Sequence, residues 1–151
     1  LKDLSGNDIK LSMLFGDKDD LILVHNMGKS CTYCTMWADG FIGIQPHLED
    51  RAAFVVTTPD DPAVIKEFAD SRDWTFRLYS VKEGPFKKDM GFESDDGSPQ
   101  PGVSVFHKNA DGTIQRTGSD FFGPGDRYCA VWPFLDMLKD GPNGWEPKYK
   151  Y

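Results

Sequence analysis

The amino-acid sequence predicts an α/β fold with a central mixed sheet, in which a parallel βαβαβ half precedes a C-terminal antiparallel hairpin, with helices on both faces. Short strand-like segments at 21–26, 52–58 and 74–78 alternate with segments of helical periodicity, which indicates parallel strands joined by right-handed crossovers. A turn at 109–112 ends in Asp-Gly between two extended segments, as is typical of a hairpin. The 151 residues are enough for one core, so a single domain over 1–151 is expected.

Residues 1–20 are expected to form an N-terminal extension to this domain. The turn signal at 5–7 lies between two short extended pieces and predicts a small hairpin. Ser12 is placed to cap one helical turn that ends at Gly16. The unbroken apolar character of 21–26 then predicts a strand that is covered on both faces.

A long helix is expected from Thr32 to Leu48. Its apolar residues recur at spacings of three and four, which is the pattern of a helix with one buried face. They are Tyr33, Trp37, Phe41, Ile44 and Leu48. Pro46 is expected to kink or end the helix near its last turn, because proline has no N–H to donate.

The second half of the parallel unit begins with Asp61 as the N-cap of a helix and Pro62 in its first position. The buried face of this helix is expected to contain Val64, Ile65, Phe68 and Ala69. The alternating segment 74–78 predicts a half-exposed strand, and one helical turn is expected at 86–90.

The C-terminal part is expected to form hairpin strands at 102–107 and 113–117, and then a last helix over 126–139 that Pro133 breaks or restarts. A tail at 141–151, rich in proline, glycine and aromatic residues, is expected to pack against the domain. The inward-facing residues of the last helix are predicted to be Tyr128, Trp132, Leu135 and Leu138.

The composition narrows the possible functions. A net charge of −7 disfavours binding to nucleic acid or to an anionic membrane surface, because both are negatively charged. No apolar run is long enough to span a bilayer, and none has the character of a signal peptide. Three cysteines do not make a disulfide-rich scaffold, which favours a cytoplasmic location. The chain begins at Leu1 rather than Met, so removal of a leader stays open.

The stretch with the clearest chemistry is Cys31-Thr32-Tyr33-Cys34, between a predicted strand and a predicted helix. A cysteine at a helix start faces unpaired backbone N–H groups and the positive end of the helix dipole. Both lower its pKa and make Cys31 a candidate nucleophile. Cys34 lies one turn further on the same face, where it can attack a mixed disulfide formed on Cys31.

A cysteine pair of this spacing also occurs in zinc sites and in structural disulfides. Zinc takes four ligands, usually from two such pairs. The other candidate ligands are scattered along the chain, at Cys129, His25, His47 and His107. We therefore expect no metal site and no cofactor, while a structural disulfide remains an alternative. Cys129 is interpreted as a small buried hydrophobe rather than a third redox thiol.

The motif and its context resemble the thioredoxin fold, and more specifically the bacterial DUF899 family of predicted dithiol–disulfide oxidoreductases. The segments that carry the resemblance are 31–41 (CTYCTMWADGF), 74–76 (WTF), 101–106 (PGVSVF) and the terminal 145–151. The sequence departs from thioredoxin in having Ser30 where thioredoxin has tryptophan, and in having Thr-Tyr rather than Gly-Pro between the cysteines. The redox potential and the substrate are therefore not carried over.

The resemblance implies further site residues. Thioredoxins have a buried acid in the strand, six residues before the first cysteine, and the matching residue here is His25. We expect His25 to be either a proton acceptor beneath Cys34 or a hydrogen-bonded core residue. Thioredoxin-fold enzymes also have a cis-proline before a strand, which implies a cis bond between Gln100 and Pro101, with Pro101 against the cysteines and the Gln100 backbone docking an extended substrate. An ordinary trans-proline is the alternative. The remaining candidate substrate-binding residues are Thr32, Tyr33 and Trp37.

Three functions are consistent with these residues. The first is a thiol–disulfide oxidoreductase, whose partners are a disulfide-containing protein or small-thiol substrate and an unknown reductant. The second is a peroxiredoxin-like thiol peroxidase. Residues 1–20 favour it, because they resemble the opening of redoxin domains, where a small hairpin precedes the first core strand, although the Pro and Thr framework of peroxiredoxins is missing before Cys31. The third is a copper-binding module in which His25 or His107 supplies a third ligand.

Overall fold

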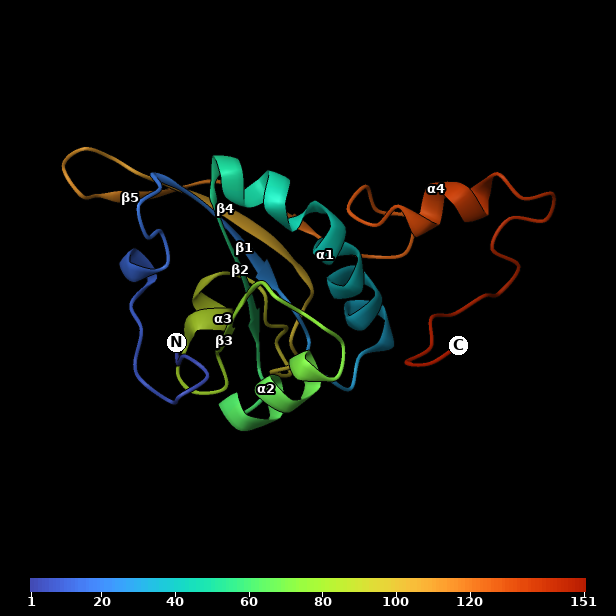
Figure 1. Cartoon of the computed structure of the whole chain (residues 1–151), viewed down its shortest axis with the longest axis horizontal. Helices are drawn as coiled ribbons and strands as arrows, with labels where there is room; N and C mark the ends of the chain where they lie inside the picture. Colours follow the sequence, from blue (N-terminus) through green and yellow to red (C-terminus); the bar gives the residue numbers. More distant parts are fainter.

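A five-stranded mixed sheet forms the centre of the computed structural model, which describes all residues 1–151 (Figure 1). Its strands are β1 (Asp20–His25), β2 (Ala53–Thr58), β3 (Arg77–Ser80), β4 (Gly102–Lys108) and β5 (Ile114–Phe121). Their spatial order is β3-β2-β1-β4-β5. The pairs β1–β2 and β2–β3 are parallel, whereas β1–β4 and β4–β5 are antiparallel. The predicted mixed sheet with a C-terminal hairpin is confirmed.

Helices cover both faces of the sheet, as expected. They are α1 (Thr32–Arg51), α2 (Pro62–Asp70), α3 (Phe86–Asp89) and α4 (Val131–Asp136), together with a 3-10 turn, η1 (Leu11–Met13). Side chains of α1, α2 and α4 share one buried cluster with one face of the sheet. The opposite face of the sheet packs against Leu14 and Phe15, which follow η1, and against Phe86 of α3. No helix is both long enough and apolar enough to cross a membrane.

The alternation of side chains along β1 decides which residues reach which cluster. Leu21 and Leu23 belong to the cluster on the α3 face, whereas Val24 belongs to the cluster on the α1 face. Successive strand residues point to opposite faces, so His25 points with Leu21 and Leu23, away from α1. This assignment decides the role of His25 below.

Helix α1 runs three residues beyond its predicted end and passes through Pro46. Proline removes one backbone hydrogen bond, and the turn that follows remains closed by the bond from the Ala52 N–H to the Leu48 carbonyl, at 2.9 Å. Ile44 is 44% exposed, so its predicted place on the buried stripe is wrong.

Strand β3 begins at Arg77, three residues later than predicted, because Trp74 belongs to the connection after α2. The Trp74 N–H bonds the Ala69 carbonyl at 3.1 Å, and the indole N–H reaches Asp39 on α1 at 2.9 Å. Asp61 is the N-cap of α2, but its carboxylate makes no capping bond and pairs with Lys82 instead.

The last helix is much shorter than predicted. Asp126 does not start it, because its carboxylate accepts the N–H groups of Tyr128 and Cys129 at 2.8 and 3.1 Å and closes a loop. Pro133 falls in the first turn of α4, where its missing N–H costs nothing, so α4 begins at Val131. Leu138 lies beyond α4 and is 57% exposed, which contradicts its predicted inward position.

The N-terminal extension lies along the edge strand β3. An isolated bridge joins Lys2 to Asp8, as the predicted hairpin requires, and a second bridge joins Lys2 to Ser80. Ser12 lies inside η1, whose N-cap is Lys10, so the predicted cap is wrong. At the other end of the chain, the segment after α4 returns toward the first turn of α1 (Figure 1).

Candidate active site

The two thiols lie where the sequence places them, at the start of α1. Cys31 is the N-cap residue with an extended backbone (φ −99°, ψ 108°), and its sulfur accepts the Cys34 N–H at 3.1 Å. Cys31 is half-buried, Cys34 is 2% exposed, and both are free thiols. The sulfur of Cys31 thus takes the place that a Ser, Thr or Asp oxygen usually has at a helix start.

The two cysteines have opposite pKa shifts. A hydrogen bond from the Cys34 thiol, together with the backbone N–H groups of Cys34 and Tyr33, lowers the pKa of Cys31 to about 7, although burial opposes this. The same hydrogen bond, burial and the charge on Cys31 raise the pKa of Cys34 far above its ordinary value. Near neutral pH, a large fraction of Cys31 is therefore thiolate, while Cys34 keeps its proton and acts as the donor.

The loop between β1 and α1 holds this pair in place through the backbone. The Asn26 side chain accepts the Gly28 N–H at 2.7 Å and donates to the Cys34 carbonyl at 3.3 Å. The Met27 N–H points to the Cys34 sulfur at 3.4 Å, and this contact favours the thiolate of Cys34. Sequence reasoning missed these groups, since a strand followed by two Cys residues carries no local signal for a backbone donor.

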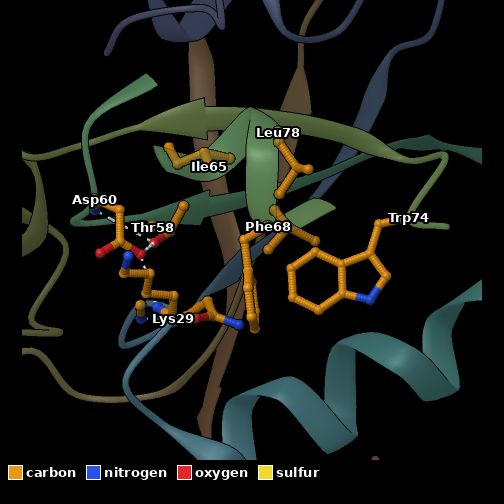
Figure 2. A pocket seen from close by; sticks show the side chains of 10 residues that line it. Lys29, Thr58, Asp60, Ile65, Phe68, Trp74 and Leu78 are labelled. Atoms are coloured by element: carbon orange, nitrogen blue, oxygen red, sulfur yellow. Dashed lines mark hydrogen bonds between the residues drawn. The ribbon is translucent and has the colours of Figure 1, made fainter. Parts of the chain in front are cut away.

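Asp60, which follows β2, anchors the same loop from the α2 side. Its carboxylate accepts the Lys29 N–H at 2.8 Å and the Thr58 hydroxyl at 2.9 Å, as Figure 2 shows. Gly28 has φ 101°, a left-handed conformation that favours glycine, and a Cβ there would also come within 2.9 Å of that carboxylate. No local sequence signal marks Asp60 as part of this site.

The cleft beside Asp60 is too small to take a substrate. Its apolar wall consists of Ile65, Phe68, Trp74 and Leu78, which face the loop across the cleft in Figure 2. The free volume is about 10 Å³, which is room for about one water molecule. The contact between α2 and the loop is therefore closely packed.

The predicted role of His25 as a proton acceptor beneath Cys34 is wrong. Its ring lies on the sheet face opposite α1, stacks on Phe92 at 3.9 Å between centroids, and shares a hydrogen bond of 2.9 Å with the Ser104 hydroxyl. Burial, with a smaller effect of the Arg116 charge, lowers the pKa of His25 to about 3. His25 is therefore the neutral core residue of the alternative interpretation.

The predicted cis bond at Pro101 is also wrong, since the chain has no cis peptide bond. The Gln100 N–H is already bonded to the Phe92 carbonyl at 2.9 Å, and the Pro101 carbonyl accepts the Phe122 N–H at 2.9 Å. The extended backbone makes both of these hydrogen bonds with the Gln100–Pro101 peptide in the trans form. The docking role assigned to Gln100 and Pro101 rested on the cis bond and is withdrawn.

The other predicted substrate-binding residues separate into two groups. Trp37 is 3% exposed and packs against Tyr33 and Phe122, so it is a core residue. Thr32 and Tyr33 are partly exposed between the two cysteines and stay candidates for substrate contact.

Neither histidine can complete a copper site with the two thiols. His107 bonds Asp20 at 2.7 Å, at the end of β1 that lies farthest from the loop to α1. His25 lies on the opposite face of the sheet, and no group of three or more His, Cys, Asp or Glu side chains is placed to hold a metal. Cys129 is 6% exposed, and burial raises its pKa, so it is a poor nucleophile.

The family model described as "Bacterial protein of unknown function (DUF899)" matches residues 4–150. The match spans almost the whole chain, so the chain belongs to the DUF899 family, as the sequence resemblance suggested. A comparison with curated proteins gives no match.

Solved structures share the fold at low sequence identity. Peroxidoxin BcpB from Mycobacterium tuberculosis is 22% identical with a TM-score of 0.63, covering 80% of this chain and 79% of that one. A thioredoxin-like protein solved in its oxidized form is 19% identical with a TM-score of 0.56, covering 80% and 78%. An uncharacterized conserved protein from Geobacillus kaustophilus is 15% identical with a TM-score of 0.58, covering 99% and 81%. The thioredoxin-like fold is thereby confirmed.

Cys31 is expected to be the first thiol that an alkylating agent modifies. Its rate should rise as the pH passes through about 7, because the thiolate is the reactive form. Cys34 and Cys129 should stay protected by burial. Limited iodoacetamide treatment over a pH series, followed by mass mapping, measures this, and preferential labelling of either buried cysteine would contradict it.

His25 is expected to weaken the fold at acidic pH. Its folded pKa of about 3 lies below the ordinary 6.5, so in this window the unfolded chain binds the additional proton. The free energy of unfolding should therefore fall as the pH drops from 6.5 toward 3. Urea unfolding at a series of pH values should show a flatter profile for His25→Gln. His47→Gln on the exposed side of α1 is the matched control, and an equal flattening there would refute the assignment.

Proposed function

We propose that this DUF899-family chain catalyses thiol–disulfide exchange through Cys31 and Cys34. The observation that carries the proposal is the half-buried Cys31 sulfur at the N-cap of α1, with a pKa of about 7 and a protonated Cys34 thiol bonded to it. A nucleophile that ionises near neutral pH, next to a second thiol at the spacing of a disulfide, is the arrangement that exchange chemistry requires.

In the first step, the Cys31 thiolate attacks one sulfur of a substrate disulfide. A bond forms between the Cys31 sulfur and that sulfur, the substrate S–S bond breaks, and the second substrate sulfur leaves as a thiolate that water protonates. The partly exposed Thr32 and Tyr33, between the two cysteines, are the residues proposed to contact the substrate.

The second step needs Cys34 to lose its proton, and the first step itself promotes this loss. The hydrogen bond to Cys31 and the Cys31 charge are among the causes that raise the pKa of Cys34, and both are lost once Cys31 is in a mixed disulfide. The Met27 N–H, at 3.4 Å from the Cys34 sulfur, then stabilises the new thiolate. Cys34 gives its proton to solvent and attacks the Cys31 sulfur. The S–S bond between Cys31 and the substrate breaks, and the substrate leaves as a thiolate that water protonates. An external dithiol then reduces the Cys31–Cys34 disulfide.

The proposal needs two partners and no bound cofactor. The oxidised partner is a disulfide-containing protein or a small disulfide, and the reduced partner is a thiol reductant that regenerates the dithiol. Cys129 takes no part, because it is buried and its pKa is raised.

Substitution of the two cysteines should separate the two steps. Cys31→Ser should reduce insulin disulfide reduction to the uncatalysed rate, because no nucleophile remains. Cys34→Ser should accumulate a stable mixed disulfide on Cys31, visible as a mass adduct. Cys129→Ala is the matched control and should retain wild-type activity. If Cys31→Ser keeps its activity, the proposed nucleophile is wrong.

A second candidate function is that of a thiol peroxidase, which the similarity to a peroxidoxin over 80% of this chain favours. The Cys31 thiolate would attack the peroxide O–O bond to give a sulfenic acid and an alcohol or water. Cys34 would then displace water and form the disulfide.

Peroxide consumption distinguishes this function from the first. If the chain is a peroxidase, it consumes hydrogen peroxide or an alkyl hydroperoxide with dithiothreitol as reductant, and Cys34→Ser accumulates a Cys31 sulfenic acid that dimedone traps. Insulin reduction without peroxide consumption excludes this second function.

A further inference from the structure

We propose that the C-terminal segment 145–151 is a strap across the loop before Cys31, and that Tyr149 is a positioning residue for Cys31. The Tyr149 hydroxyl donates to the Lys29 carbonyl at 2.9 Å, across 120 residues of sequence. This inference deepens the proposed function, because it assigns to the strap the geometry on which the nucleophile depends.

The strap and Asp60 hold Lys29 from both sides. The Lys29 N–H donates to Asp60 at 2.8 Å, while the Lys29 carbonyl accepts from Tyr149 at 2.9 Å. With both backbone groups fixed, the turn closed by the bond from the Cys31 N–H to the Gly28 carbonyl, at 3.1 Å, has little freedom. That turn places the Cys31 sulfur over the first N–H groups of α1.

Arg72, which follows α2, anchors the strap. Its guanidinium donates to the Tyr149 carbonyl at 3.0 Å and also forms two hydrogen bonds with the carboxylate of Asp39 on α1. The Arg72 side chain is only 19% exposed, so water screens its two-bond pairing with Asp39 less than it screens an ion pair on the surface. The Tyr149 ring adds an edge contact with Phe68, at 6.3 Å between centroids.

The Tyr149 hydroxyl lies close enough to the dithiol to sense its charge. Burial first, and then the negative charge of the dithiol, raise the pKa of Tyr149. The phenol therefore keeps its proton, and remains a donor to the Lys29 carbonyl, throughout the pH range in which Cys31 ionises. The charged or titratable groups around Cys31 are Cys34 on α1, Tyr149 on the strap, Lys29 on the loop and Asp60 behind it.

The consequence concerns the reactivity of Cys31. Loss of the Tyr149 hydrogen bond loosens the loop, and the contact of 3.1 Å between the Cys31 sulfur and the Cys34 N–H loosens with it. When the hydrogen bonds to the Cys31 thiolate weaken, the thiolate is less stable. The pKa of Cys31 then rises, and a smaller fraction of Cys31 is ionised at pH 7.

The test is the pH–rate profile of Cys31 alkylation by iodoacetamide in full-length variants. Tyr149→Phe should move the profile midpoint upward, because losing one hydrogen bond weakens the ionisation of Cys31 by up to about tenfold. From a pKa of about 7, this should slow alkylation at pH 7 by about 1.5- to fivefold. Arg72→Gln, which frees the strap from its anchor, should shift the midpoint in the same direction.

Tyr151→Phe is the matched control on the same strap. Its hydroxyl accepts the Lys148 N–H at 3.2 Å, the residue is 86% exposed, and its removal should leave the Cys31 profile at wild type. A Tyr149→Phe profile that coincides with those of wild type and Tyr151→Phe would overturn the inference. The inference would also be overturned if Tyr149→Phe lowered the melting temperature and the alkylation rate without shifting the midpoint of the pH–rate profile, because Tyr149 would then have only a structural role.

The failure of this inference is distinct from the failure of the proposed function. Alkylation reports on the Cys31 thiolate and involves no disulfide substrate. If Tyr149→Phe shifts the profile while the wild-type chain fails to reduce insulin, the strap is supported and the proposed exchange activity is rejected.

Discussion

The contact between the Cys31 sulfur and Cys34 is the interaction on which the rest of the site depends. A single sulfur accepts both the backbone N–H and the thiol of Cys34, so one contact lowers the pKa of Cys31 and raises that of Cys34. It spans only one helical turn, but it requires Cys31 to stay outside the helix with extended dihedral angles. The surrounding structure supplies that constraint through the loop.

The sheet topology explains how the loop is held. β1 is the central strand and runs parallel to β2, so the carboxyl ends of both strands meet at one edge of the sheet. The loop to α1 leaves that edge from β1, and Asp60 follows β2 at the same edge. The bond from the Lys29 N–H to Asp60 therefore follows from strand order, although 31 residues separate the two in sequence.

Patterns within single segments predicted the strands, the main helix and the position of the dithiol, because each depends on neighbours in the sequence. The face of His25 was not readable in this way. The run from Leu21 to Val24 is apolar throughout, as in any strand covered on both sides, and it contains no alternation that would assign His25 to a face. The contact between Arg72 and Tyr149 crosses 77 residues of sequence, and only the aromatic composition of the tail hinted at it.

The absence of a base near Cys34 changes how the two steps are coupled. In the proposed exchange, with His25 on the other face of the sheet, the state of Cys31 controls the proton on Cys34, so the resolving thiol becomes reactive only after the nucleophile has been consumed. Stabilising the thiolate also stabilises the reduced dithiol and raises its reduction potential. A Cys31 pKa of about 7 is a modest stabilisation. The nucleophile of a strongly oxidising dithiol ionises at about 3.5. For the exchange proposed above, this modest stabilisation of the Cys31 thiolate favours donation of electrons to a substrate disulfide over withdrawal of electrons from substrate thiols.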